Sequence, residues 1–187
     1  MKEILVKDLM VPLDEYATIN DNATLYDAVL ALEKAQAEFD KSHNTYRHRA
    51  VLVYDKGGKI VGKLSQLDLL RSLEPKYNQA AAESGRMMTS GFSRSFLRSL
   101  IQQFSLWDKP LADICKKAAR QLVTDHMYIP EEGEFVESED SLDVAINQLV
   151  LGHHQSLLVV KDKEIVGILR LTDVFREVAN TIKACEI

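Results

Sequence analysis

The chain has 187 residues, of which 46% are hydrophobic and 27% are charged, and its formal net charge is −5 at pH 7. This composition is typical of a water-soluble chain that buries a core. No apolar run approaches the ~20 residues that cross a bilayer, so we expect no membrane association. The two cysteines, Cys115 and Cys185, lie far apart, and the N-terminus lacks the apolar stretch of a secretion signal. We therefore expect a cytoplasmic protein with neither a disulfide framework nor a metal site.

In the first part of the chain, apolar spacing predicts a helix, two strands and a second helix. The apolar face of the first helix is formed by Leu25, Ala28, Val29 and Leu32. Thr24 or Asn22 is a suitable N-cap for it. Apolar runs at 51–54 and 59–64 predict paired strands, and residues 68–73 predict a short closing helix.

Between residues 75 and 110 the sequence predicts a helical insertion. Residues 80–82 and 93–104 have helical patterns, and 111–122 predict an amphipathic helix leading into the next part of the chain. The pattern at 93–104 has an unusually broad apolar face, formed by Phe92, Phe96, Leu97, Leu100, Ile101 and Phe104. Such a face is too apolar for a free linker, so we expect it to pack on the rest of the chain or on a second subunit.

The insertion and its surroundings differ in charge from the rest of the chain. Segment 75–122 contains eight basic and three acidic residues, so it carries +5 while the remainder carries −10. This asymmetry indicates an interaction surface or an intramolecular docking segment. Nucleic-acid binding is less favoured, because the basic residues are dispersed and no nucleic-acid-binding motif accompanies them.

The last part of the chain repeats the element order of the first. The apolar face of its first helix is formed by Leu142, Ala145, Ile146 and Leu149. Ser141 or Asp140 is a suitable N-cap. Strands are predicted at 157–160 and 164–169, followed by a helix from about residue 172. The continuous apolar strands indicate helices packed on a sheet, and hence an α/β (α+β) fold built from two βαββα units. The first copy is longer by twelve residues around 36–48, which predicts a lengthened helix and a polar loop.

Short motifs confirm that the two parts are copies of one unit. Val-Lys-Asp-Leu-Met at 6–10 returns as Val-Thr-Asp-His-Met at 123–127. An Ile-Val-Gly sequence followed by an Asp occurs at 60–68 and again at 165–173. The period is far longer than that of a solenoid repeat, so it indicates duplication of a small module, with a ligand expected at the seam between the copies.

These motifs resemble a stand-alone tandem pair of CBS domains, the regulatory modules named after cystathionine β-synthase. The resemblance rests on the Val-x-Asp-x-Met entry, the hydroxyl-Leu helix start and the Gly-x-x-Ser-x-x-Asp close at 62–68. The second close, at 167–173, has Arg170 where the family has Ser or Thr. The resemblance covers residues 1–74 and 111–183.

The resemblance implies a module organisation and a function. Residues 1–74 would form the first CBS module, 75–110 the helical insertion and 111–187 the second module, the two modules packing as a pseudo-twofold pair. Such pairs form homodimers, bind AMP, ADP, ATP or S-adenosylmethionine between the modules, and regulate a separate protein. We therefore expect a regulatory small-molecule ligand, no other cofactor, an unidentified protein partner and no enzymatic activity.

The resemblance also assigns residues to two clefts, with the closing Asp on the ribose hydroxyls and its neighbour near the phosphate. The first cleft would use Ser65, Asp68, Ala50 and Val51. The second would use Asp173, Arg170, Thr172, Ser156, Leu157 and Thr18. A carboxylate accepts two ribose hydroxyls well, and a guanidinium binds two phosphate oxygens, which favours Arg49 and Arg170 as phosphate partners.

Other interpretations of the same residues remain open. Ser65 and Asp68 also fit a helix capping box. Arg170 fits an ion pair, and the missing hydroxyl at that position fits an altered or empty cleft. The alternative function is a ligand-free dimerisation or docking module that acts through the inserted amphipathic helix.

Overall fold

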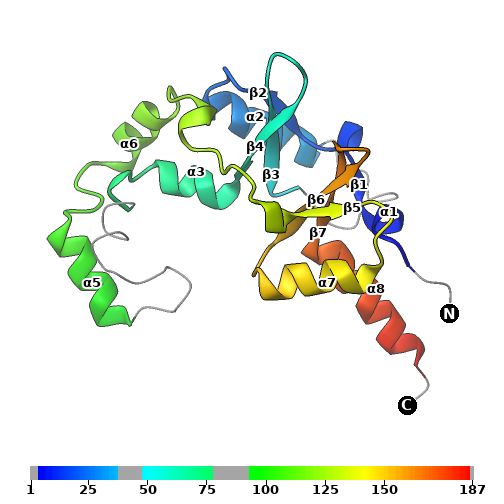
Figure 1. Cartoon of the computed structure of the whole chain (residues 1–187). Coiled ribbons are helices and arrows are strands. Elements are labelled where there is room, and N and C mark those ends of the chain that lie inside the picture. Colours follow the sequence, from blue (N-terminus) through cyan, green and yellow to red (C-terminus); the bar gives the residue numbers. More distant parts are fainter. Residues whose placement is uncertain (1–3, 38–47, 78–92, 186–187) are drawn as a thin grey trace.

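The structure, a computed structural model, describes residues 4–37, 48–77 and 93–185 (Figure 1). It has the mixed α+β architecture that the sequence predicts. In chain order, with η for 3-10 helices, the elements are α1 (Val6–Leu9), β1 (Val11–Pro12), η1 (Leu13–Glu15), β2 (Thr18–Asn20), α2 (Leu25–Ala37), β3 (Ala50–Tyr54), β4 (Ile60–Ser65), α3 (Gln66–Ser72), α5 (Arg94–Gln103), α6 (Leu111–Ala118), η2 (Val123–Asp125), η3 (Glu132–Glu134), β5 (Phe135–Glu137), α7 (Leu142–Leu151), β6 (Ser156–Lys161), β7 (Glu164–Arg170) and α8 (Leu171–Ala184).

Two small sheets correspond to the two predicted copies. One has the strand order β2-β3-β4 and the other β1-β7-β6-β5. In both, a short first strand (β2 or β5) pairs in parallel with the middle strand, which pairs antiparallel with the last. The predicted helices and strands of both copies are confirmed. Helix α6 ends at Ala118, earlier than expected, because the chain then turns into the first core.

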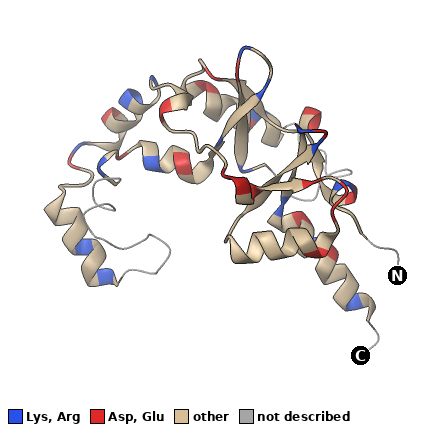
Figure 2. Cartoon of the chain, in the orientation of Figure 1, with Lys and Arg blue, Asp and Glu red and all other residues tan. Residues whose placement is uncertain are grey.

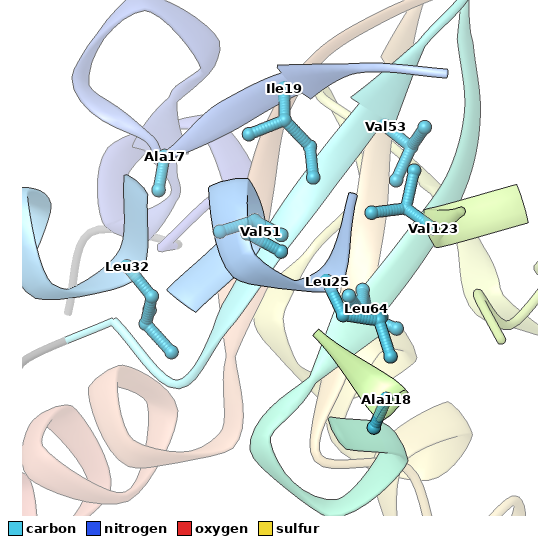
Figure 3. Close-up of a cluster of buried hydrophobic side chains, with 10 residues drawn as sticks. Ala17, Ile19, Leu25, Leu32, Val51, Val53, Leu64, Ala118 and Val123 are labelled. Carbon is cyan, nitrogen blue, oxygen red and sulfur yellow. The ribbon is translucent and has the colours of Figure 1, made fainter. Parts of the chain in front are cut away.

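The first sheet is covered by α2 and α3, with α6 alongside. Figure 3 shows side chains from the sheet, from α2 and from α6 converging in one cluster. Its buried members are Ala17, Ile19, Leu25, Ala28, Leu32, Val51, Val53, Leu64, Ala118 and Val123. Because strand side chains alternate between faces, Val51 and Val53 face the helices while Leu52 points to the opposite side. That alternation leaves the other face of β3 for a second contact.

The second contact joins the two copies. Leu52 of β3 and Leu158 of β6 lie in one buried cluster with Val11, Tyr16 and Ile168. Leu52 and Leu158 hold equivalent positions, since each is the partner of the first residue of the short parallel strand. The sheets therefore meet through the faces without helices, as a pseudo-twofold pair (Figure 1).

The entry segments of the two copies cross over to the opposite core. Val6 is fully buried in the core of the second sheet, while Val123 is fully buried in the core of the first. Isolated bridges hold both crossings in the same way, with Leu5 paired to Ser141 and Leu122 paired to Thr24. Each core is thus completed by residues that precede the other copy in the sequence.

The inserted helix α5 lies apart from both sheets (Figure 1). None of its residues is buried, and Leu97 and Ile101 are 44% and 48% exposed. Of the two expected places for its apolar face, the described residues show no burial on the two copies, and packing on a second subunit stays a prediction. The chain after α5 is nevertheless anchored, because the backbone N–H of Trp107 donates to Glu74 at 2.8 Å. The predictions for Phe92, for 80–82 and for most of 36–48 concern residues outside the described part.

The charge asymmetry is visible on α5, whose charged residues are Arg94 and Arg98 (Figure 2). Acidic residues lie instead on other elements, including two on η3 and one in the first turn of α8 (Figure 2). Among the described helices, none has the length and apolar character needed to cross a membrane.

Candidate functional site

A cavity of about 490 Å³ lies between the two copies and takes side chains from both. The first copy contributes Arg49, Ala50, Lys63, Ser65, Asp68 and Arg71. The second contributes Tyr128, Glu134, His153, His154, Ser156, Arg170 and Thr172. The cavity is within the size range of small-molecule sites, and it lies at the seam where the duplicated sequence predicts a ligand.

The start of α3 forms one side of this cavity, and it is a capping box. The Ser65 N–H and hydroxyl donate to Asp68 Oδ2 at 2.9 and 2.6 Å, and the Asp68 N–H donates to Ser65 Oγ at 3.2 Å. The capping interpretation is therefore confirmed. The other carboxylate oxygen, Oδ1, has Arg71 at 3.4 Å, and the Asp68 side chain keeps 13% exposure. That oxygen is the one available to a ligand.

Elsewhere in the lining, the buried Glu134 forms a charged cluster with residues from both copies. Lys63 Nζ lies 3.2 Å from Glu134 Oε1 and 5.6 Å from the centre of the Tyr128 ring. The hydrogen bond to Glu134, with burial, raises the pKa of Tyr128 to about 12. Burial acts to raise the pKa of Glu134, but the Tyr128 hydrogen bond and the Lys63 charge outweigh it and lower that pKa. The cluster is therefore an ionised carboxylate held between a phenol and an ammonium.

Backbone pairing places Lys63 and Tyr128 side by side. The N–H of each donates to the carbonyl of the other, at 2.9 and 2.8 Å. Lys63 Nζ also lies 3.4 Å from Ser156 Oγ, at the start of β6. This lysine therefore joins the last strand of the first copy to the middle strand of the second.

Two histidines complete the wall at the end of α7. His153 adopts a left-handed backbone conformation with φ of 52°, and His154 follows it into the cavity. His154 Nδ1 lies 3.8 Å from Glu134 Oε1. The strained turn thus places an imidazole beside the buried carboxylate.

The sequence-predicted site residues divide into two sets. Those that line the cavity are Arg49, Ala50, Ser65, Asp68, Ser156, Arg170 and Thr172. Those that lie outside its lining are Val51, Leu157 and Asp173, which are almost fully buried, and Thr18, which is exposed. The structure therefore brings parts of both predicted clefts into one cavity.

Sequence reasoning missed Lys63, Tyr128 and Glu134 as site residues. Lys63 stands inside the motif at 62–68, but nothing in the motif distinguishes it. Glu134 and Lys63 are 71 positions apart, and no local spacing rule connects residues so distant. Tyr128 directly follows the repeated Val-x-Asp-x-Met entry, and this place next to a repeated motif was the one feature of the sequence that could have indicated a site residue.

The cavity suits an anionic ligand that also carries hydroxyl groups. Its lining has four basic side chains and two acidic ones, counting histidine as neutral. Arg49 forms no ion pair with any residue in the described ranges. Guanidinium and ammonium groups bind phosphate oxygens, while Asp68 Oδ1 accepts hydroxyl hydrogens.

Comparison with solved structures shows the same fold in several proteins. Protein MJ1004 of Methanocaldococcus jannaschii has 20% identity and a TM-score of 0.57, over 95% of this chain and 60% of that one. The CBS domain of a membrane protein from Sphaerobacter thermophilus has 19% identity and a TM-score of 0.59, over 93% and 87%. CBSX2 of Arabidopsis thaliana, in a complex with AMP, has 22% identity and a TM-score of 0.57, over 96% and 98%.

A family model described as the CBS domain matches residues 6–75 and again residues 119–180, which together form more than half of the chain. No curated protein matches the chain. Both matched ranges begin near an entry segment, and they end just after α3 and within α8, so they coincide with the two structural copies. The chain therefore belongs to the CBS domain family, and its two copies pair as a CBS regulatory module.

Proposed function

We propose that this chain is a sensor that binds an adenine nucleotide between its CBS domains and transmits binding to a partner protein. One observation carries the proposal. Ser65, Asp68 and Arg49, to which the family resemblance assigns ribose and phosphate contacts, line one cavity with Tyr128 and Glu134 of the other copy. The AMP found in the CBSX2 complex supports the adenine class of ligand.

Charge favours a nucleotide over S-adenosylmethionine. The basic excess of the lining attracts phosphate groups, whereas a sulfonium ligand would bring a further positive charge beside Arg49, Arg71 and Arg170. The ligand phosphate would lie near Arg49 and Arg170, and its ribose near Asp68. Glu134 already has Lys63 and Tyr128 as partners, so it shapes the wall instead of repelling the phosphate.

The test is thermal unfolding and titration calorimetry with AMP, ADP, ATP and S-adenosylmethionine. A nucleotide present at 100 times its Kd should stabilise the protein by about 2.7 kcal/mol. Asp68→Asn should weaken binding by about 10- to 100-fold, because a charge-assisted hydrogen bond to the ribose is lost.

Asp27→Asn is the matched control for this substitution. Asp27 forms the same capping box with Thr24 at the start of α2, where the Thr24 N–H donates to it at 2.9 Å, but α2 does not line the cavity. This control should leave nucleotide affinity unchanged. Absence of binding by all four compounds, or equal affinity in wild type and Asp68→Asn, would contradict the proposal.

A second candidate function is self-association through α5, and the observation that favours it is the exposure of Leu97 and Ile101 on this helix. A second copy is the proposed occupant. An apolar hollow of about 620 Å³ lies between α2, α3 and α6 and includes Glu33 in its lining. Helix α5 carries Arg94 and Arg98 and no acidic residue, so its positive charge complements the negative charge of Glu33 in this hollow.

Sedimentation of wild type and of Leu97→Glu/Ile101→Glu tests this candidate. The wild type should be a dimer at micromolar concentration, and the double variant should shift toward monomer because charges enter the apolar face. Gln102→Glu/Gln103→Glu adds the same charge at exposed polar positions and should remain dimeric. A monomeric wild type, or equal dissociation of both variants, would exclude this interface.

A further inference from the structure

The two CBS domains begin their closing helices with different residues at equivalent positions. Ser65 pairs in register with Ala50, and Arg170 pairs in register with Ser156, each at the end of the last strand. An aspartate follows three residues later in both copies. Arg170 therefore occupies the structural position of Ser65, and the two carboxylates, Asp68 and Asp173, can be compared directly.

Asp173 is engaged on both of its oxygens. Arg170 Nε donates to Oδ2, and a second guanidinium nitrogen, Nη2, donates to Oδ1 at 3.0 Å. Arg176 lies 3.8 Å from the same Oδ1. Asp173 is only 2% exposed and lies outside the lining of the cavity. Asp68, by contrast, lines the cavity with a side chain that is 13% exposed, and among the described residues its Oδ1 has only the half-exposed Arg71 at 3.4 Å.

Aromatic rings fill the space beside the Arg170–Asp173 pair. Tyr16 and His48 pack edge to face with ring centroids 4.4 Å apart, and they are 7% and 4% exposed. Burial, and then the Arg170 guanidinium, lower the pKa of His48, so this ring is neutral beside the ion pair. Within the described residues, His48 Nδ1 has no hydrogen-bond partner.

In the first cleft, the residue at the position of Tyr16 has no ring. Thr18 of β2 and Phe135 of β5 are equivalent, because they pair with the equivalent Leu52 and Leu158. Tyr16 and Gly133 each lie two residues earlier, so they are equivalent as well. Glycine has no side chain at this position, whereas Tyr16 places a ring against His48 in the second cleft and also lines the edge of the cavity. Two substitutions, Arg170 for serine and Tyr16 for glycine, thus distinguish the second cleft from the first.

We propose that Arg170 closes the second cleft by pairing with Asp173, so that each chain binds a single nucleotide, in the first cleft. Arg170 also lines the first cavity, where its guanidinium adds positive charge near the phosphate. Opening the second cleft requires separating a buried bidentate ion pair, and a ribose offers Asp173 only neutral donors in exchange. This inference rests on the proposed nucleotide-binding function.

The test is the binding stoichiometry of AMP, ADP and ATP, measured by equilibrium dialysis with the full chain. Wild type should bind one nucleotide per chain, and Arg170→Ser, which recreates the first-cleft motif, should bind two. The first site of Arg170→Ser should weaken by about tenfold, because one positive charge leaves its phosphate region. Arg176→Ser, which removes the other arginine near Asp173, is the matched control and should still bind one.

A reverse exchange keeps the test decisive if Arg170→Ser does not fold. Ser65→Arg places an arginine beside Asp68 and should abolish nucleotide binding in a folded protein. Two nucleotides on the wild type, one on folded Arg170→Ser, or unchanged binding by Ser65→Arg would overturn the inference. If the wild type binds no nucleotide but Arg170→Ser binds one, the proposed function of the first cleft is wrong. The closure of the second cleft by Arg170 would still be supported by that result.

Discussion

Glu134 shows how one residue depends on partners from across the molecule. Its side chain is 5% exposed, with Lys63 Nζ at 3.2 Å and His154 Nδ1 at 3.8 Å. The pKa of Glu134 is lower in the folded state, because its hydrogen bond from Tyr128 and the Lys63 charge outweigh burial. A lowered carboxylate pKa stabilises the fold at neutral pH, and this contribution is lost as pH falls through the lowered value.

We therefore expect Glu134→Gln to reduce the free energy of unfolding by about 2 kcal/mol at pH 7. The difference from wild type should shrink as pH falls through and below the glutamate range near about pH 4. Urea unfolding at neutral and acidic pH measures both effects. Glu132→Gln, at an exposed neighbouring position, should change neither value. A difference that stays constant with pH would exclude the ionised cluster.

At the scale of elements, the crossing of the entry segments depends on two equivalent glycines. Gly167 of β7 pairs with Pro12 of β1, and a Cβ atom there would lie 2.6 Å from the Val11 carbonyl oxygen. A Cβ atom on Gly62 would lie 2.9 Å from Met127 Cγ. The close approach of each entry segment thus explains the glycine that ends the Ile-Val-Gly motif in both copies.

Gly167→Ala should destabilise the protein by about 1–3 kcal/mol, because the contact is with backbone that cannot rotate away. Chemical unfolding measures the loss. Gly133→Ala is a suitable control, since a Cβ atom there would lie 4.0 Å from His154 Nε2, an ordinary contact distance. Equal stability of the two variants would mean that β1 does not pack against β7 as described.

On the scale of the whole molecule, the two CBS domains depend on each other for their cores. Val6 completes the core of the second sheet, and Val123 completes that of the first. A third cluster joins the sheets through Leu52 and Leu158. We therefore expect both domains to unfold in one cooperative transition, with equal calorimetric and van't Hoff enthalpies.

Val123→Ala tests this coupling. It should cost about 2 kcal/mol, from two lost methyl groups and a partial cavity, and lower the melting temperature by about 4–8 °C as a single transition. Thr124→Ala, at an exposed adjacent position, should have little effect. Two separate calorimetric transitions would show that the domains are stable independently.

Local patterns in the sequence were sufficient to predict the duplicated domains, their helices and strands, and the capping box of Ser65 and Asp68. Each of these follows from residues a few positions apart, through helical or strand periodicity or an i, i+3 hydrogen bond. Seven of the predicted site residues line the cavity. Each of them lies close to the end of a strand, and local periodicity was sufficient to locate those strand ends.

Contacts between distant residues could not be predicted in this way. The crossing of Val6 and Val123, the Lys63–Glu134–Tyr128 cluster and the burial of Asp173 depend on how the two sheets face each other. An arginine at 170 fitted an ion pair or an altered cleft equally well from sequence. Only tertiary packing removes Asp173 from solvent. Because Asp173 is buried and both of its oxygens are paired with Arg170, separating this ion pair is costly.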